Sequence, residues 1–232
     1  MRFSVVVLLV AMTSMALGGD ITVKRLQGDV RVRHGVTEHW SAVAVGDVLR
    51  PNDSVKTGKG GSTVLELIRE DSGTARAVTL PPEVIVDVSD MRTLTQEELM
   101  LKLTMEKVRS SSYQWKNDEL RMPDAAVVHG QGSGSEEELN ENDRATGRLQ
   151  LNGARVLYEN GFYSTCILRA MEVFRHYPWM AESFSDRLMV AEALAECDLR
   201  GEALAEYGAI SRMEGLGEEE RMLVRERMDA MK

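Results

Sequence analysis

Residues 21–92 form a run of short alternating segments separated by turn residues, and this pattern constrains the fold more than any other feature of the sequence. Val30-Arg31-Val32-Arg33 alternates strictly between apolar and charged side chains, which is typical of a strand with one buried face. Pairs such as Gly46-Asp47 and Asn52-Asp53 supply turns between segments. About seven short strands with frequent turns predict an all-β sandwich or barrel over residues 19–92.

The sequence changes character after this β segment. Residues 93–121 contain strong helix formers, and Thr95 followed by Glu98 is a capping box, so we expect a helix that lies on the β domain or in an interface. Residues 122–142 contain a Gly/Ser tract followed by three glutamates, and they are predicted to be a flexible linker. Residues 143–232 regain a helical period with alanine-rich stretches, which predicts close-packed antiparallel helices.

The first 18 residues have the features of a secretory signal. Arg2 supplies a positive charge, an apolar run follows, and Ala16-Leu17-Gly18 offers small residues to a signal peptidase. The apolar run is shorter than the roughly 20 residues that span a bilayer, so we expect cleavage after Gly18 rather than an uncleaved anchor. The protein is therefore predicted to be periplasmic or otherwise exported, with no membrane span after signal cleavage.

The net charge of −9 bears on the class of partner. The acidity belongs to the C-terminal part, because residues 93–232 hold 17 basic and 26 acidic side chains. Binding to phosphates requires clustered lysines and arginines, so nucleic acid is not an expected partner.

Few residues of the sequence indicate a catalytic, metal-binding or phosphate-binding site. His34 and His39 flank a turn, but a metal site needs three or four ligands and no third is evident. The loop at residues 58–62 lacks the residue order of a phosphate-binding loop, and the carboxylates are scattered over predicted helices. We therefore predict no catalytic, cofactor-binding or metal-binding residues, and we expect a protein that is not an enzyme.

Cys166 and Cys197 are the two cysteines of the chain. An exported protein is in a compartment that permits disulfides. Cys166 begins one predicted helix and Cys197 ends the next, so antiparallel packing would place both at a similar height. A disulfide requires Cα atoms within about 7 Å, which is closer than most helix axes approach. A bond between Cys166 and Cys197 and a pair of buried thiols that replace small alanines both stay open.

A series of short motifs follows in order along the β segment: Gly28-Asp29-Val30, Trp40, Val45-Gly46-Asp47, Asn52 to Gly58, Gly61 to Leu65, and Leu80-Pro81. Their order and spacing resemble the FecR domain, a periplasmic module of bacterial iron-signalling regulators that is also found in other exported proteins. The resemblance implies a compact β sandwich in the periplasm. Regulatory members carry a cytoplasmic segment and a membrane span before the domain, whereas a signal peptide stands there in this chain. Sigma-factor regulation is therefore not implied.

The C-terminal segment contains small, aromatic and turn residues at the spacing of helical hairpins. The first set is Ala154, Leu157, Tyr158, Gly161, Tyr163, Cys166, Ala170 and Pro178. A shift of 37 residues gives Ala191, Leu194, Ala195, Asp198, Arg200, Ala203, Tyr207 and Gly215. This pattern resembles tetratricopeptide repeats, although the period exceeds the usual length of about 34 and the second set lacks the turn glycine. The resemblance implies tetratricopeptide-like helical hairpins over residues 147–215, with residues 218–231 as a capping helix.

In tetratricopeptide proteins the first helices of the hairpins line an inner groove that holds peptides or partner helices. Arg155, Tyr158, Glu192 and Glu196 fall on that side of the predicted helices and are the candidate partner-binding residues. The alternative is that each is an ordinary solvated side chain.

These observations predict an α+β protein with its β and helical parts in separate domains. The predicted function is an exported adaptor: the FecR-like domain binds an envelope component, such as a cell-wall or receptor ligand, and the helical repeats bind an envelope protein partner. A flexible linker would raise the effective concentration of the second partner. Two other functions stay open, namely a component of periplasmic signal regulation that acts on a membrane sensor in trans, and a cell-wall glycan binder.

Overall fold

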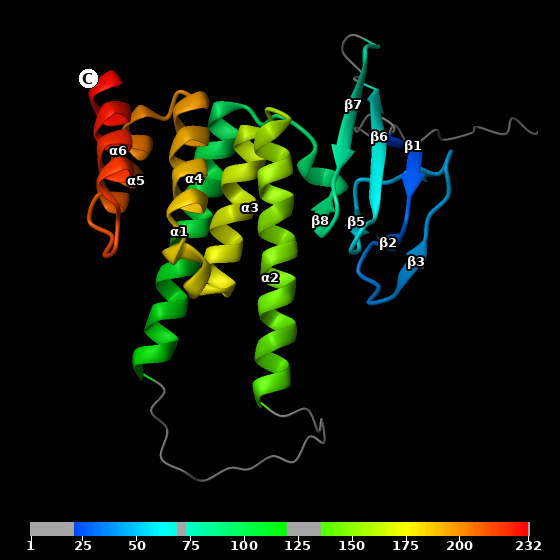
Figure 1. Cartoon of the computed structure of the whole chain (residues 1–232), viewed down its shortest axis with the longest axis horizontal. Coiled ribbons are helices and arrows are strands. Elements are labelled where there is room, and N and C mark those ends of the chain that lie inside the picture. The colour runs from blue at the N-terminus through cyan, green and yellow to red at the C-terminus, as the bar shows by residue number, and fades with distance from the viewer. Residues whose placement is uncertain (1–20, 69–72, 120–135, 232) are drawn as a thin grey trace, which may run out of the picture.

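The computed structural model describes residues 21–68, 73–119 and 136–231. Within these residues eight strands precede six α-helices, and the two kinds of element occupy opposite ends of the molecule (Figure 1). The expected order of a β part followed by a helical part is confirmed. The predicted signal peptide lies outside the described residues.

The strands form two four-stranded antiparallel sheets. One sheet has the order β4-β1-β6-β7 and the other has the order β3-β2-β5-β8. The strands are β1 Ile21–Gln27, β2 Val30–His34, β3 Trp40–Ala42, β4 Val48–Leu49, β5 Asp53–Thr57, β6 Ser62–Ile68, β7 Ala75–Leu80 and β8 Val84–Asp87. Val30 and Val32 are buried while Arg31 between them is exposed, as the alternation predicts.

Six α-helices follow the strands in the described residues, with one short 3₁₀ segment before α1 and another between α3 and α4. They are η1 Val88–Asp90, α1 Gln96–Glu119, α2 Glu136–Glu159, α3 Tyr163–His176, η2 Pro178–Glu182, α4 Phe184–Glu196, α5 Arg200–Ile210 and α6 Glu218–Ala230. The predicted cap of α1 is present, because the Glu98 amide donates to Thr95 Oγ1 at 3.2 Å. No helix in the described ranges combines the length and apolar character needed to cross a membrane.

The predicted linker over residues 122–142 is wrong in its last third. Residues 136–142 form the first turns of α2, and residues 122–135 lie outside the described part of the chain. Glutamates favour the N-terminus of a helix through the helix dipole, which explains why the acidic run starts a helix.

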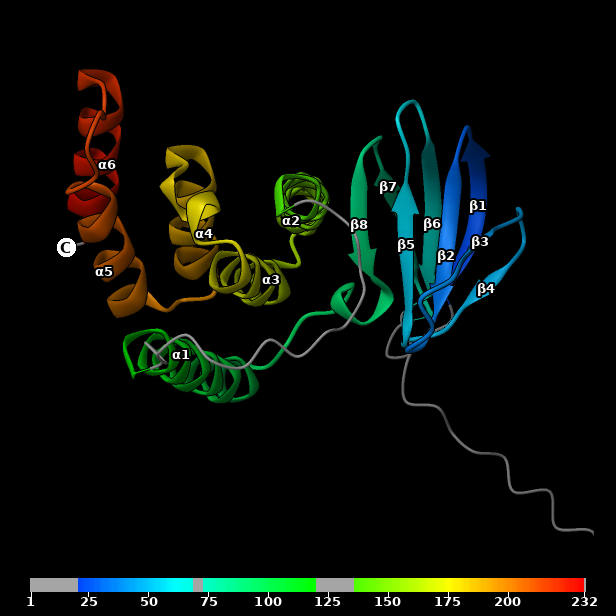
Figure 2. The same cartoon turned by 90° about the horizontal axis from the view of Figure 1, so that it is seen from below.

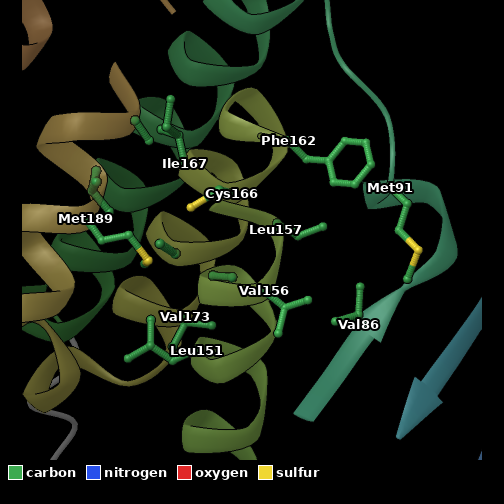
Figure 3. Close-up of a cluster of buried hydrophobic side chains, with 14 of the residues drawn as sticks. Val86, Met91, Leu151, Val156, Leu157, Phe162, Cys166, Ile167, Val173 and Met189 are labelled. Carbon is green, nitrogen blue, oxygen red and sulfur yellow. The ribbon is translucent and has the colours of Figure 1, made fainter. Parts of the chain in front are cut away.

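The two halves of the molecule pack directly on each other. Figure 2 shows α2 beside β8, and the approach is close, because a Cβ atom added to Gly153 would lie 2.0 Å from the carbonyl oxygen of Ile85. Asn152 Nδ2 donates to the Glu83 carbonyl at 2.9 Å. In Figure 3, side chains of α2 lie toward Val86 and Met91 of the β half.

Polar contacts reinforce this interface. Thr165 Oγ1 on α3 donates to the Asp90 carbonyl at 2.6 Å, and Ser164 Oγ accepts from the Leu94 amide at 3.0 Å. Arg169 forms ion pairs with Asp87 and Asp90. Buried side chains of both halves belong to one cluster. The expectation of a flexible linker between the two parts is therefore wrong: β8 leads through η1 to α1, and the segment after α1 connects two helices of the helical half.

The long helix α1 packs on α3 rather than on the sheets. Leu99 and Leu103 are 1% and 3% exposed, and the buried Glu106 pairs with Arg175 of α3. The small residues predicted to allow close helix packing are fully buried, namely Ala154, Ala170, Ala191 and Ala203.

Candidate functional site

The four predicted groove residues lie on α2 and α4, and three of them are engaged by neighbouring helices. Arg155 Nε donates to Asp186 Oδ1 at 3.0 Å. Tyr158 donates its hydroxyl to Glu192 Oε2 at 3.0 Å, and burial together with this contact raises the pKa of Tyr158. Glu196 is exposed.

A residue of α6 completes this network. Arg227 Nη2 lies 3.2 Å from Glu192 Oε1, so Glu192 connects α2, α4 and α6. Sequence reasoning placed Tyr158 and Glu192 on the same side but did not identify their partners. These side chains hold three helices together, and their hydrogen bonds are already satisfied within the chain.

The structure contains a groove on another side, which the sequence did not reveal. A cavity of about 780 Å³ lies between α1 and the helices α3, α4 and α5. We call it the α1 groove. Its walls are mainly apolar and include Leu103, Met171, Phe174, Val190, Leu194 and Ala205.

Charged side chains surround these walls. Arg187 Nε pairs with Glu206 Oε1 at 2.6 Å across α4 and α5, and Arg175 pairs with Glu106. Lys107 also lines the groove. An apolar floor with charges of both signs at its margin suits an amphipathic segment, because apolar side chains gain from burial while polar ones find partners.

A second and more polar cavity of about 400 Å³ lies between α2, η2 and the start of α4. Three arginines of α2 and Trp179 line it. In the β half, Trp40 lies beneath two cations: Arg33 Cζ is 5.2 Å and Lys56 Nζ is 5.7 Å from the ring centroid.

Cys166 and Cys197 are free thiols in the structure. Cys166 is fully buried between helices, and this burial raises the pKa of its thiol to about 12. Burial, with a contribution from Glu196, also raises the pKa of Cys197. A buried, protonated thiol is a poor nucleophile, so Cys166 packs as a small apolar group, while Cys197 is only partly buried.

Over the described ranges, no group of three histidine, cysteine or carboxylate side chains is placed to hold a metal ion. His34 Nδ1 instead lies 3.0 Å from Asp53 Oδ1. Neither a protein-family model nor a curated protein matches this sequence.

Proposed function

We propose that the protein is an exported, non-catalytic adaptor whose helical half holds a segment of a partner protein in the α1 groove. The observation that carries this proposal is the groove itself, an apolar cavity of about 780 Å³ lined by four helices. Cavities of this size enclose an anchor side chain together with its neighbours on a bound helix or peptide.

The lining of the groove supports a protein partner over a small apolar molecule. Phe174 and Leu194 offer apolar contact area, whereas Glu202 and Lys107 add charges that an amphipathic helix can match. The predicted groove over α2 and α4 is a weaker candidate, because Tyr158 and Glu192 are already bonded to each other.

The β half is the second arm of the proposed adaptor. Its motifs resemble the FecR domain, and its two sheets are compatible with a sandwich that binds or senses an envelope component. The helical hairpins are similarly compatible with tetratricopeptide-like repeats. The interface at Gly153 and Arg169 would set the distance between the two binding surfaces, in place of a flexible linker.

One observation favours a second function for the β half. Arg33 and Lys56 both lie over the Trp40 ring on one sheet, and their two positive charges, rather than ring stacking, would suit the anionic groups of an acidic cell-wall glycan. A Trp40→Ala variant that no longer sediments with isolated cell wall, while Trp179→Ala still does, would support glycan binding. Equal sedimentation of the two variants would exclude glycan binding at Trp40.

The adaptor proposal is tested by blocking the α1 groove without removing a buried residue. Ala205 is exposed at the groove, so Ala205→Trp fills the cavity, and Ala230→Trp places the same side chain at the exposed end of α6. Cross-linking in the native cell should capture a defined envelope protein with the unmodified chain and with Ala230→Trp, but not with Ala205→Trp. Undiminished capture by Ala205→Trp would show that the groove does not hold the partner.

A further inference from the structure

Three arginines form a basic face on α2. Arg144, Arg148 and Arg155 are spaced by four and seven residues, so they lie on one side of the helix. This face borders the polar cavity of about 400 Å³, which we call the arginine pocket. It stands out because residues 93–232 carry a net charge of −9, from 17 basic and 26 acidic side chains.

The three arginines differ in what they contact. Arg155 is occupied, because its guanidinium donates to Asp186 and to Asn152 Oδ1 at 2.9 Å. Arg144 and Arg148 are exposed, and within the described ranges neither pairs with a carboxylate. The pocket therefore contains one carboxylate for three guanidinium groups, which leaves an excess of positive charge in a concave site.

The remaining walls of the pocket are apolar or weakly polar. Leu151 and Met180 are buried at 3% and 8% exposure, whereas Trp179 is 39% exposed. Ser183 contributes a hydroxyl. A ligand that fits these walls needs an anionic group for the arginines and an adjoining apolar group for Trp179.

The environment of Trp179 discriminates between a peptide and a sugar. A sugar ring would stack flat on an indole face, but the Arg144 guanidinium lies 5.9 Å from the ring centroid and the Tyr177 ring packs edge-on at 5.6 Å. These neighbours reduce the flat surface that a sugar would use. A side chain from a peptide requires less of that surface.

We propose that the arginine pocket binds an acidic peptide segment of a partner protein. A carboxylate is held between Arg144 and Arg148, and the adjacent apolar side chain packs on Trp179 above Leu151 and Met180. Guanidinium groups suit this role because they donate paired, charge-assisted hydrogen bonds to a carboxylate. The arginine pocket shares no lining residue with the α1 groove, so this site is distinct from the one in the proposed function.

The test uses the chain without its signal segment and a fluorescent peptide that carries two glutamates beside a phenylalanine. We expect anisotropy to report binding that weakens about tenfold or more in the double variant Arg144→Gln/Arg148→Gln, because two charge-assisted contacts are lost. Arg221→Gln/Arg225→Gln is the matched control: it removes two arginines with the same spacing from α6, and it should change affinity less than about twofold. Trp179→Phe should weaken binding while leaving the charge unchanged.

Several outcomes would overturn the proposal. They are an absence of peptide binding by the unmodified chain, equal losses in the two double variants, and equal affinity for a peptide with glutamines in place of glutamates. Binding of an acidic cell-wall fragment instead of the peptide would assign the pocket to a glycan. Normal thermal unfolding of each variant excludes a folding defect. Ala205→Trp should bind the peptide normally, so the result does not depend on the α1 groove.

Discussion

Gly161 and Asp198 occupy equivalent turns 37 residues apart, and both have a backbone in the left-handed region, with φ of 69° and 58°. In the first turn the Phe162 amide donates to the Leu157 carbonyl at 2.9 Å, and in the second the Leu199 amide donates to the Leu194 carbonyl at 3.0 Å. This is the hydrogen-bond pattern of a helix that ends in a left-handed residue. The two helical hairpins therefore share a turn geometry that their sequences share only in part.

This equivalence predicts opposite effects of substitution at the two turns. Asp198→Gly should stabilise the protein by about 0.5–1 kcal/mol, because glycine adopts positive φ without the steric cost of a side chain. Gly161→Ala should destabilise it by about 1–2 kcal/mol for the converse reason. Urea unfolding of each variant measures both changes. A destabilised Asp198→Gly protein would mean that the aspartate side chain contributes more than its backbone strain costs.

The contact between Gly153 and Ile85 predicts a test of the interface between the halves. Gly153→Ala should destabilise the protein by about 1–3 kcal/mol, because the new methyl group would overlap the Ile85 carbonyl oxygen. Gly208→Ala in α5 meets only the end of the Arg212 side chain at 3.7 Å, and it should stabilise its helix by up to about 1 kcal/mol. Thermal unfolding of the two variants gives the comparison. An equal gain in thermal stability from both substitutions would mean that α2 does not pack against β8 in solution.

Arg169 is predicted to stabilise the same interface in a pH-dependent way. Burial raises the pKa of Asp90, and the adjacent Arg169 opposes this rise. Arg169→Met removes that opposition and leaves two carboxylates, Asp87 and Asp90, at a largely buried site. At about pH 7 the free energy of unfolding should fall by about 3 kcal/mol, which is typical when one partner of a buried ion pair is removed.

The sign of the pH effect follows from proton binding. With the pKa of Asp90 raised further in the folded variant, the folded state takes up a proton at a pH where the unfolded state does not. Stability of the variant should therefore fall as pH rises from about 4 to about 7, relative to the unmodified protein. Urea unfolding at both pH values measures this. Lys24→Met, which breaks the exposed pair with Glu66, should cost less than about 1 kcal/mol. A loss at Arg169→Met that does not vary with pH would contradict this account.

The sequence predicted what depends on local pattern. The alternation at Val30–Arg33 and the cap at Thr95 depend on neighbouring residues, and both are present. The resemblance to tetratricopeptide repeats placed Tyr158 and Glu192 on a common side, and the two side chains are hydrogen-bonded to each other in the structure. The α1 groove depends on where Leu103 packs after the chain leaves the sheets, and no short-range signal determines this. The direct packing of the halves has one local signal in the sequence, a glycine inside a helix at position 153, where the backbone of β8 comes close.

The two thiols should differ in their reactivity toward an alkylating reagent. Cys166 is fully buried with a pKa of about 12, so it should resist alkylation at neutral pH in the native protein, while the half-buried Cys197 reacts slowly. After denaturation without reductant, two thiols should react, as expected for free cysteines. The Cys197→Ser variant should show no native reaction and one thiol after denaturation. If the denatured, unreduced protein isolated from its native compartment yields no reactive thiol, then Cys166 and Cys197 are bonded to each other there.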